Sequence, residues 1–526
     1  MRRKHLWVLA PLMLIPFLAG LGLRTHAPVD GQLLFEEVRA RVARAAVDSL
    51  SDDKIYESAA RGLVNEIDDP YAELYSPEEL ASFSRNTLRN DYAGVGMQIQ
   101  DQLGIIVVAA VFPNSPASKG GVQAGDRILM VDTAAVSGLK IDEVSGKLVG
   151  KPGTLVTVTF LRPGQEAQIQ RKFTRAVVHV PAVPYALMLD NGVGYVPLQR
   201  FNEASAADVM TAVARLRGAG ARSFVLDLRG NPGGSVDESV AISNLFLQPG
   251  QEIVAVRYRD REAEVRRAEN DGVHISEPMI VMVDGGAASA SEIVAGALQD
   301  HDRALVVGTT SFGKGVMQSI YPLHQGWALK LTTAKWFTPS GRSIQRERVI
   351  RNGQLVEARP DSLETDSSRR ARPAYHSDAG RTVYGGGGIA PDVVVPADTI
   401  TTAEQTFLRA LGPKARESYR ALYDLALDLR PRVQASFTVQ PEWREDFFHR
   451  LETVGAPVTR AQFDAARPLV DRLLEQQLAT LAFGDSSAFR RTAHSDAQLQ
   501  RAVGLLRNAT TQPALYVAAG ADHPKG

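Results

Sequence analysis

The chain has 526 residues, of which 59 are basic and 59 are acidic. This length predicts several domains rather than one core, and the balanced charge gives no sign of a nucleic-acid partner, so none is expected. The absence of cysteine excludes disulfides, a thiol nucleophile and a cysteine-bound metal.

Residues 1–30 are predicted to direct export. The basic residues 2–4 precede an uncharged stretch, 6–23, that is rich in Leu, Met, Phe and Ile. Such a segment is a signal peptide if it is cleaved and a membrane anchor if it is retained, and no good A-x-A cleavage site follows it. A buried core helix is the alternative. The charge asymmetry predicts an extracytoplasmic (periplasmic) protein, secreted across the inner membrane or anchored to it.

The next two regions differ in their pattern of apolar residues. Residues 31–88 carry helical periodicity and are predicted to form an N-terminal helical segment. Residues 89–176 consist of short apolar runs separated by Gly, Pro, Asn and Asp, which predicts a β-rich module. Within this module, "SPASKGGVQAGDRILMVD" predicts a short helix, a glycine turn and a strand.

Residues 177–345 alternate between strand and helix patterns. Strands are predicted in "GVGYVPLQRF", "SFVLDLRG", "PMIVMVD" and "RALVVG", with helices over 204–217, 236–246 and 289–300. This alternation predicts α/β architecture, so the whole chain is classed as multidomain α/β. Three further regions follow: a polar stretch without periodicity that is expected to be an exposed insertion (346–384), a strand that returns to the core (385–400), and a helical C-terminal region of unknown role (401–526).

Two serines lie among small residues at the start of the third predicted helix, in "VDGGAASASEIVAGALQD". Small residues permit a close approach by a neighbouring chain, and the first N–H groups of a helix carry the positive end of its dipole. Ser289 and Ser291 therefore either cap the helix, with Glu292 in a capping box, or supply a nucleophile beside an oxyanion site. Two serines allow both roles at once.

A hydroxyl nucleophile needs a base, and the nearby candidates are Asp300, His301 and Lys314. The G-x-S-x-G elbow is absent, which weakens an α/β-hydrolase interpretation. Lys314 can act as a base only when it is uncharged, and that requires burial to lower its pKa. The flanking sequence "VVGTTSFGKGVMQSIYPL" is apolar and holds no carboxylate; an exposed, solubilising lysine is the alternative.

The same lysine ends a Gly308-x4-Gly313-Lys314 pattern that matches most of a phosphate-binding loop. Gly315 stands where a Ser or Thr would bind magnesium, and the residues after it do not open a helix. A nucleotide site is therefore not expected.

The strand "SFVLDLRG" ends in a glycine-rich turn, residues 230–234. The backbone N–H groups of such a turn are bare enough to approach a reacting carbonyl. A plain strand-to-helix turn is the alternative. Together with the helix start at Ser289, this turn is consistent with two halves of an oxyanion hole.

In their order along the chain, these segments resemble the carboxyl-terminal processing proteases, also called tail-specific proteases, which are Ser/Lys endopeptidases with an embedded PDZ domain. The resemblance spans roughly residues 33–345 and returns at "GGGGIAPDVVV"; its segments are "DPYAELYSPEEL", "YAGVGMQI", "SPASKGGVQAGDRILMVD", "LDLRGNPGG", "ASASEIVAGALQD", "VVGTTSFGKGVMQ" and "FTPSGRSIQ". It implies a ClpP/crotonase-like spiral ββα protease core, an inserted β-rich PDZ domain, and helical N- and C-terminal segments.

By this resemblance the nucleophile is Ser289, the general base is Lys314, and Gln318 orients the lysine. In a flat strand the Cα atoms of residues 314 and 318 would lie about 13 Å apart. A bend near Gly315 or a reaching lysine is therefore needed.

The resemblance also implies an oxyanion hole made by the backbone N–H groups of Gly233 or Gly234 and of Ala290. No metal, cofactor or ATP is implied. Asp300, after the helix, is expected to be structural.

The PDZ-like segment implies how a substrate is recognised. Its loop would bind the terminal carboxylate of a protein or peptide through backbone N–H groups, and the following edge strand would pair with the tail. Substrates with apolar C-terminal residues are expected; the loop residues are Gly94, Val95, Gly96 and Met97.

The chain departs from the family's pattern in three places. Asp284 stands where an Asn is common, 42 residues lie between Gln345 and Gly388, and residues 401–526 have no counterpart. The N-terminal helical segment resembles the part that pairs subunits in some relatives, so a homodimer is possible. Two other classes of protein remain as alternatives: a non-catalytic PDZ scaffold on a protease-like core, and an acyl-CoA-handling enzyme with a similar core.

Overall fold

The computed structural model describes residues 30–84, 91–269, 274–351, 354–357, 366–397 and 400–520. The predicted export segment lies outside the described residues up to Val29. Among the residues that are described, no helix is long and apolar enough to cross a membrane. The chain divides after Leu74 into two compact units.

The first unit contains two helices whose starts are fixed by side-chain caps. Helix α2 (Gly31–Ala45) follows Asp30, whose carboxylate accepts hydrogen bonds from two N–H groups of the first turn. Helix α3 (Asp52–Glu66) follows Ser51, whose hydroxyl accepts from the Lys54 N–H. The short strand β1 (Glu73–Tyr75) ends this part of the chain.

The second unit begins with α4 (Pro77–Phe83) and continues into the β-rich module. The module's sheet has the strand order β3-β4-β5-β7-β8, with β3 at one edge. Its elements are β2 (Asp91–Gly94), β3 (Met97–Gln102), β4 (Ile105–Val111), α5 (Pro116–Lys119), β5 (Arg127–Val131), β6 (Ala134–Ala135), α6 (Ile141–Leu148), β7 (Leu155–Leu161), β8 (Gln168–Thr174) and β9 (Ala176–His179). The predicted short helix, glycine turn and strand are confirmed as α5, the turn and β5.

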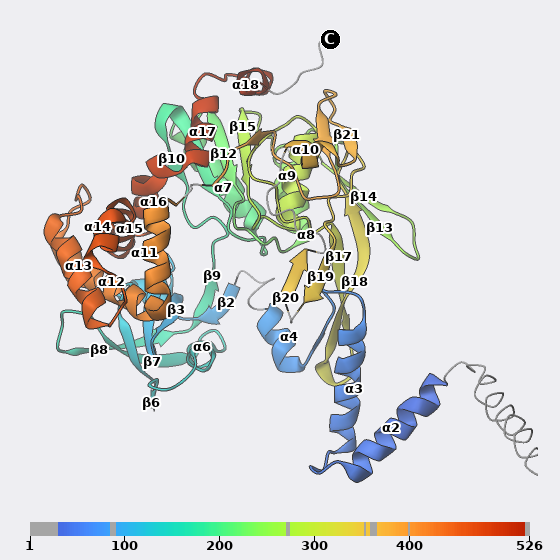
Figure 1. Ribbon diagram of the computed structural model, residues 1–526, viewed down its shortest axis with the longest axis horizontal. Coiled ribbons are helices and arrows are strands. Elements are labelled where there is room, and N and C mark those ends of the chain that lie inside the picture. Colours follow the sequence, from blue (N-terminus) through green and yellow to red (C-terminus); the bar gives the residue numbers. More distant parts are fainter. Residues whose placement is uncertain are drawn as a thin grey trace, which may run out of the picture. The chain divides into compact units, whose positions relative to one another are not determined.

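A six-stranded sheet forms the centre of the core, with the order β10-β11-β12-β15-β16-β23 (Figure 1). Only the β10–β11 pair is antiparallel. The strands are β10 (Leu187–Met188), β11 (Val193–Pro197), β12 (Ser223–Asp227), β15 (Met279–Val283), β16 (Leu305–Gly308) and β23 (Val393–Val394). The mixed α/β architecture is confirmed, while the spiral ββα arrangement stays a prediction.

Alternate residues of this sheet belong to two different cores. On one face Val196, Leu226 and Val281 pack with α7 (Ser205–Gly218), α8 (Val236–Asn244) and α9 (Ala290–Asp300). On the other face Tyr195 and Met282 pack with the C-terminal helices. Parallel strands covered on both faces explain the continuous apolar runs in the sequence, and the three predicted helices are confirmed to within two residues.

A second, antiparallel sheet carries the segment that follows Lys314. It contains β14 (Glu264–Arg267), β13 (Glu252–Tyr258), β18 (Ala328–Phe337) and β17 (Val316–Pro322), paired in that order. Trp336 on β18 is buried.

The expectation that residues 346–384 form an exposed insertion is wrong at its C-terminal end. Arg381 is 4% exposed and forms ion pairs with Asp302 and Asp392, both at 2.5 Å. The described parts of this stretch form regular elements: β19 (Arg348–Arg351), β20 (Gln354–Glu357), α10 (Asp366–Arg370), β21 (Ala374–His376) and β22 (Thr382–Tyr384). The polar composition predicted exposure, but Arg381 is buried because carboxylates from other segments pair with its charge.

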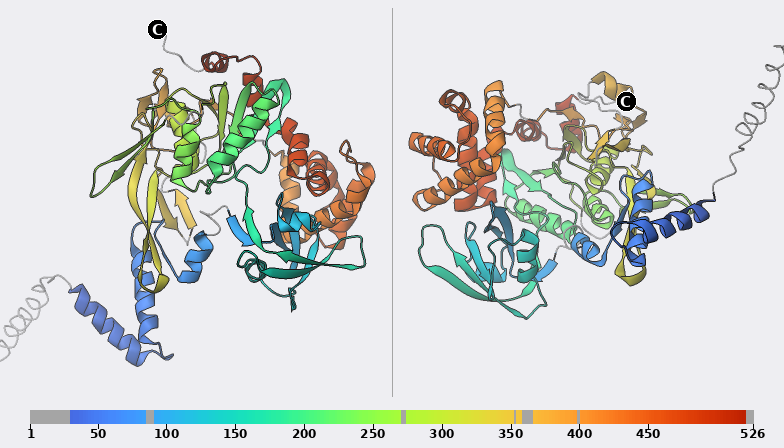
Figure 2. Two further views of the ribbon diagram at one scale, coloured as in Figure 1. Left: turned by 180° about the vertical axis from the view of Figure 1, so that it is seen from behind. Right: turned by 60° about the horizontal axis from the view of Figure 1, so that its bottom comes forward.

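The C-terminal region forms helices with two separate packing partners (Figure 2). Helices α11–α15 surround a core that includes Val107 of β4, whereas α17 and α18 cover the second face of the six-stranded sheet. The helices are α11 (Thr402–Leu411), α12 (Ala415–Leu429), α13 (Pro441–Thr453), α14 (Arg460–Ala465), α15 (Arg467–Phe483), α16 (Asp485–Thr492), α17 (Ala497–Leu506) and α18 (Gln512–Ala519).

Candidate active site

Ser289 stands directly before α9 in a strained backbone conformation. Its φ is 56° and its ψ is −113°, a combination that non-glycine residues rarely adopt. All eleven residues of α9 are buried, so the surrounding packing holds this conformation in place. Backbone strain of this kind is concentrated at functional sites.

The glycine turn predicted to face this serine does lie against it. A Cβ added to Gly233 would come within 2.9 Å of Ser289 Cβ and of Ala290 N. The carbonyl of Asn231, in the same turn, accepts hydrogen bonds from Ala288 N (3.0 Å) and Ser291 Oγ (2.9 Å). The turn and the serine therefore form one site, and no side chain fits at position 233.

The hydrogen bonds of the turn show which of the candidate oxyanion donors already has an acceptor. Gly233 N donates to Asn231 Oδ1 at 2.9 Å, so this N–H group is already engaged. Gly234, whose φ is 149°, and Ala290 donate their N–H groups to no acceptor within the described residues. The geometry favours Gly234 and Ala290 as the donor pair.

Asp284, the residue that departs from the family's pattern, ties the turn to the loop before the nucleophile. Its Oδ1 accepts hydrogen bonds from Gly230 N (2.8 Å), Gly286 N (2.9 Å) and Ala287 N (3.1 Å). An acceptor that receives three N–H groups suits a carboxylate well.

Glu292 connects the backbones of the two predicted catalytic residues. Its buried carboxylate accepts hydrogen bonds from Ser289 N (2.8 Å), Lys314 N (2.8 Å), Gly313 N (2.6 Å) and Ser311 Oγ (2.5 Å). Burial raises the pKa of Glu292 above its usual value of 4.5, and its hydrogen-bond donors, which favour the ionised form, oppose that rise.

The sequence assigned Glu292 only to the start of the helix. Its contacts with the Lys314 loop join residues that are 22 positions apart. A capping pattern spans one helical turn, so it carried no signal for this contact.

The Lys314 loop is held from several sides by backbone contacts. Trp336 donates from Nε1 to the Lys314 carbonyl at 3.1 Å and from its backbone N to the Gly315 carbonyl at 3.0 Å. Gly315 N donates to Gln345 Oε1 at 2.7 Å. Arg348, from the polar stretch, donates to the carbonyls of Phe312 and Gly313.

The chain after this loop enters strand β17. This bears on the phosphate-binding loop and on the path from Lys314 to Gln318. A phosphate-binding loop would open a helix here, so that interpretation is excluded. Gly313, just before Lys314, has a φ of 85°, and a register shift lies between Met317 and Gln318; the bend near Gly315 or the reaching lysine stays a prediction. Gln318 Nε2 donates to Thr332 Oγ1 at 3.2 Å; its role beside Lys314 stays a prediction.

Asp300 and His301 lie at the opposite end of α9 from Ser289. Eleven residues of helix span about 16 Å, so neither side chain is placed to take a proton from Ser289. His301 instead contacts Asp378 and the Glu252 carbonyl, both at 2.7 Å. Asp300 forms a buried ion pair with Arg342 at 2.7 Å and accepts from Thr338 Oγ1 at 2.5 Å.

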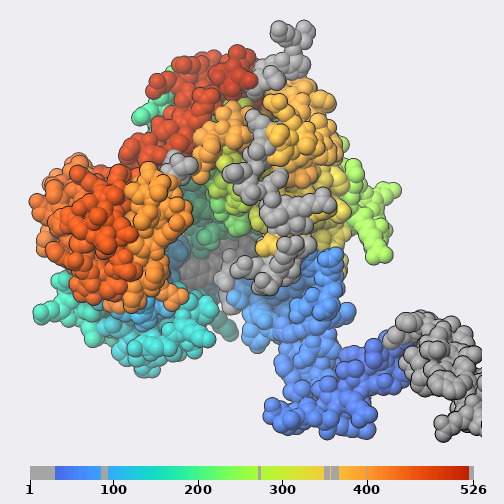
Figure 3. Space-filling model, viewed as in Figure 1, coloured from blue at the N-terminus to red at the C-terminus, as the bar shows by residue number. Residues whose placement is uncertain are grey.

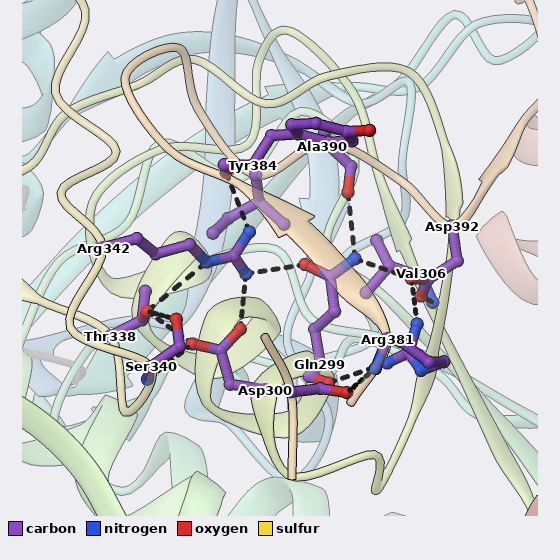
Figure 4. Close-up of polar contacts among 12 residues, drawn as sticks. Gln299, Asp300, Val306, Thr338, Ser340, Arg342, Arg381, Tyr384, Ala390 and Asp392 are labelled. Carbon is purple, nitrogen blue, oxygen red and sulfur yellow. Dashed lines mark hydrogen bonds and ion pairs between the residues drawn. The ribbon is translucent and has the colours of Figure 1, made fainter. Parts of the chain in front are cut away.

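This ion pair belongs to a polar network that anchors the end of α9 (Figure 4). Arg342 Nη2 also donates to Gln299 Oε1 at 2.8 Å, and Gln299 Nε2 donates to the Ala390 carbonyl at 2.9 Å and to Asp392 Oδ1 at 3.0 Å. The network joins α9 to the segment that returns to the core, so a structural role for Asp300 fits.

One further contact was missed because its partner lies in the C-terminal region. Arg229, just before the glycine turn, forms ion pairs with Asp227 and with Asp496, both at 2.7 Å. It also donates to Gln498 Oε1 at 2.9 Å. The start of α17 therefore supports the chain that leads into the turn.

The predicted carboxylate-binding loop has the shape of a tight turn before an edge strand. Gly96 has a φ of 85°, and its carbonyl accepts from Phe112 N and Ser115 Oγ, both at 3.0 Å. A Cβ at Gly96 would lie 2.1 Å from Ser115 Cβ. Val95 is buried, and its carbonyl accepts from Ala117 N at 2.7 Å. Gly94 ends β2 and Met97 begins β3, so all four predicted residues lie at this turn.

Comparison with known proteins identifies two families in the chain. The model of peptidase family S41 matches residues 192–354, and a PDZ domain model matches residues 107–162. Among solved structures, the chain is similar to a photosystem II D1 C-terminal processing protease, with 29% identity, coverage of 63% of this chain and 92% of that chain, and a TM-score of 0.35.

Two curated relatives match over most of their length. Carboxy-terminal processing protease CtpA of Bacillus subtilis (strain 168) is 32% identical over 373 residues, which are 71% of this chain and 74% of the relative. A carboxy-terminal-processing protease of Bartonella bacilliformis is 37% identical over 316 residues, which are 59% of this chain and 72% of the relative. The chain therefore belongs to the carboxy-terminal processing proteases, serine-type peptidases of family S41 with a PDZ domain.

Proposed function

We propose that the protein is an endopeptidase with a Ser/Lys dyad, in which Ser289 is the nucleophile and Lys314 the general base. The observation that carries this proposal is the buried Glu292 carboxylate, which accepts a hydrogen bond from the backbone N of each residue at 2.8 Å. A nucleophile and its base must keep a fixed separation. A shared acceptor for both backbones provides that constraint.

In the proposed reaction, uncharged Lys314 takes the proton of the Ser289 hydroxyl as Oγ attacks a substrate carbonyl. The lysine then gives this proton to the leaving amine, and water repeats the cycle on the acyl-enzyme. The N–H groups of Gly234 and Ala290 stabilise the oxyanion, supported by the dipole of α9. Gln318 orients the lysine.

The PDZ domain selects the substrate by binding its C-terminal tail. The loop Gly94–Met97 receives the terminal carboxylate, and the tail pairs with the edge of β3 that no other described strand occupies. Helix α6 supplies Val144 and Leu148 to the apolar core beneath this loop, together with Val95 and Met97. This apolar surrounding supports a preference for tails that end in apolar residues.

Removing the last three residues of an unfolded substrate protein with an apolar tail is expected to slow its cleavage by the full chain at least about tenfold. The truncated substrate still ends in a carboxylate, so the loss comes from the apolar side chains of the tail and amounts to roughly 1.5–3 kcal/mol for one buried side chain. The measurement is kcat/KM for the intact and the truncated substrate at equal concentrations. Equal rates for the two substrates would remove tail recognition from the proposal.

We propose further that cleavage takes place outside the cytoplasm. The support is the apolar segment 6–23 with its preceding basic residues 2–4. In a Gram-negative host, the full chain is expected in the periplasmic or inner-membrane fraction and accessible to protease added to spheroplasts. A chain with Glu in place of two central leucines of the segment serves as the control and is expected in the cytoplasm; finding the unaltered chain there as well would contradict this location.

A further inference from the structure

A cavity of about 630 Å³ lies where the C-terminal helices meet the PDZ domain. One wall is the β3–β4 hairpin, residues 100–104, and the other is the first turn and a half of α12, with Arg416, Tyr419 and Arg420. Figure 3 shows the orange helices adjoining the cyan PDZ domain on this side of the second unit.

Alternate residues of β3 face this cavity. In the β3–β4 pair, Gln100 lies opposite Val107 and Gln102 opposite Ile105. Val107 and Ile105 pack with the C-terminal helices, whereas the intervening Ile106 packs in the PDZ core. Directly opposed residues of paired strands share a face of the sheet, so Gln100 and Gln102 face α12.

Gln102 has an unused donor at this cavity. The residue is 7% exposed, and its Nε2 has no hydrogen-bond partner among the described residues. A buried amide donor without an acceptor is unfavourable, because it has lost its hydrogen bonds to water. Gln102 also lines the cavity, so a ligand oxygen that this amide turns to meet would remove that penalty.

A tail bound to the PDZ domain would run past the cavity. With its carboxylate at the turn before Met97, the tail would pair antiparallel with β3 and advance one residue for each residue of the strand. The residues roughly three and five positions before the last would then lie opposite Gln100 and Gln102, with their side chains toward α12.

The charges around the cavity favour an acidic side chain. Arg416 is exposed and forms no ion pair within the part of the chain that is described. Arg420 contacts Asp424 at 3.5 Å, and Asp424 is shared with Arg127 at 3.4 Å. The one acidic wall residue, Asp101, accepts a hydrogen bond from Gly104 N within its own hairpin at 2.7 Å.

We propose that this cavity is a subsite for the substrate tail that accepts an acidic side chain three or five residues before the C-terminal residue. The proposal rests on tail binding by the PDZ domain. It gives the C-terminal helical region a part in choosing substrates, because α12 supplies the arginines.

Peptide binding to the full chain carrying Ser289→Ala, which prevents cleavage, tests this subsite by fluorescence anisotropy. Three labelled ten-residue peptides share one apolar tail: the first has Glu at three and five positions before the last residue, the second has Gln at both, and the third has the two Glu at two and four positions. The third has the charge of the first but presents it on the opposite face of the strand.

The first peptide is expected to bind about 3- to 10-fold more tightly than either of the others at low salt, and the difference should shrink in 0.5 M NaCl. Adding Arg416→Gln and Arg420→Gln should bring the affinities of the first and second peptides within about twofold, whereas the third stays weaker because its Glu side chains face the apolar PDZ core. Arg409→Gln, which removes an exposed charge from α11, is the matched control and should preserve the preference.

Equal binding of the first and second peptides, or a preference for the first over the second that survives the double arginine substitution, would overturn the subsite. An amidated first peptide separates the two proposals. If amidation weakens binding but no acidic preference exists, only the subsite fails. If amidation has no effect, or if no peptide binds, tail recognition by the PDZ domain fails and the subsite fails with it.

Discussion

Replacing Ser289 by Ala, or Lys314 by Ala, is expected to reduce cleavage of an unfolded protein with an apolar tail by at least about 10³-fold. The first change removes the attacking oxygen and the second removes the group that takes its proton. Because the two residues act as a unit, the double variant should be no slower than either single one. The measurement is kcat for the full chain, with substrate well above KM.

Ser291→Ala is the matched control, since the same substitution is made two residues away on the same helix. The Ser291 hydroxyl donates to the Asn231 carbonyl at 2.9 Å, so its loss should lower the free energy of unfolding by about 1 kcal/mol. Activity should remain measurable. Full activity in Ser289→Ala would show that Ser289 is not the nucleophile.

Glu292→Gln is expected to lower kcat by about 10²-fold or more with little change in KM. A glutamine side chain offers one acceptor oxygen, whereas the carboxylate uses both oxygens for its donors from Ser289, Ser311, Gly313 and Lys314. The side-chain NH2 group of the glutamine would face backbone N–H groups that need an acceptor. The segments that carry Ser289 and Lys314 would then shift apart. Displacements of about 1 Å at a reacting centre lower rates by this order.

Stability as a function of pH separates this effect from simple misfolding. Because the pKa of Glu292 is raised above 4.5 in the folded state, the folded protein holds the proton to higher pH than the unfolded chain does. The stability that this group contributes is present below pH 4.5 and is lost as the pH rises through the folded pKa. Relative to Glu292→Gln, the free energy of unfolding of the unaltered chain should therefore fall across this window in denaturant titrations. A difference that rises with pH would contradict the buried, hard-to-ionise carboxylate.

Much of the core was predictable because its signals are local. Continuous apolar runs marked the strands of the six-stranded sheet, and helical periodicity marked α7, α8 and α9 to within two residues. The glycines at 230–234 and the small residues before Ser289 indicated a close approach of two backbones, which the contact at Gly233 confirms.

The failures have a common cause. Arginines of the polar stretch were expected in solvent, yet Arg381 is buried with Asp302 and Asp392, and Arg348 donates to the loop that carries Lys314. Composition counts charges but does not indicate their partners, and a paired arginine is compatible with burial. Asp300 and His301 are close to Ser289 in sequence and were candidates for its base. They lie at the far end of α9, so the length of the helix excludes them.

The sequence by itself determined the order of the motifs, the principal elements of the core and the membership of a protease family, because each of these is written in short stretches of residue type and spacing. Only the tertiary structure decided that Glu292 joins the backbones of Ser289 and Lys314, that the N–H group of Gly233 but not that of Gly234 has an acceptor among the described residues, and that α12 lies beside β3. Glu292 and Lys314 are 22 positions apart, and the facing parts of β3 and α12 are more than 300 positions apart; such contacts form through packing, for which spacing in one chain carries no signal.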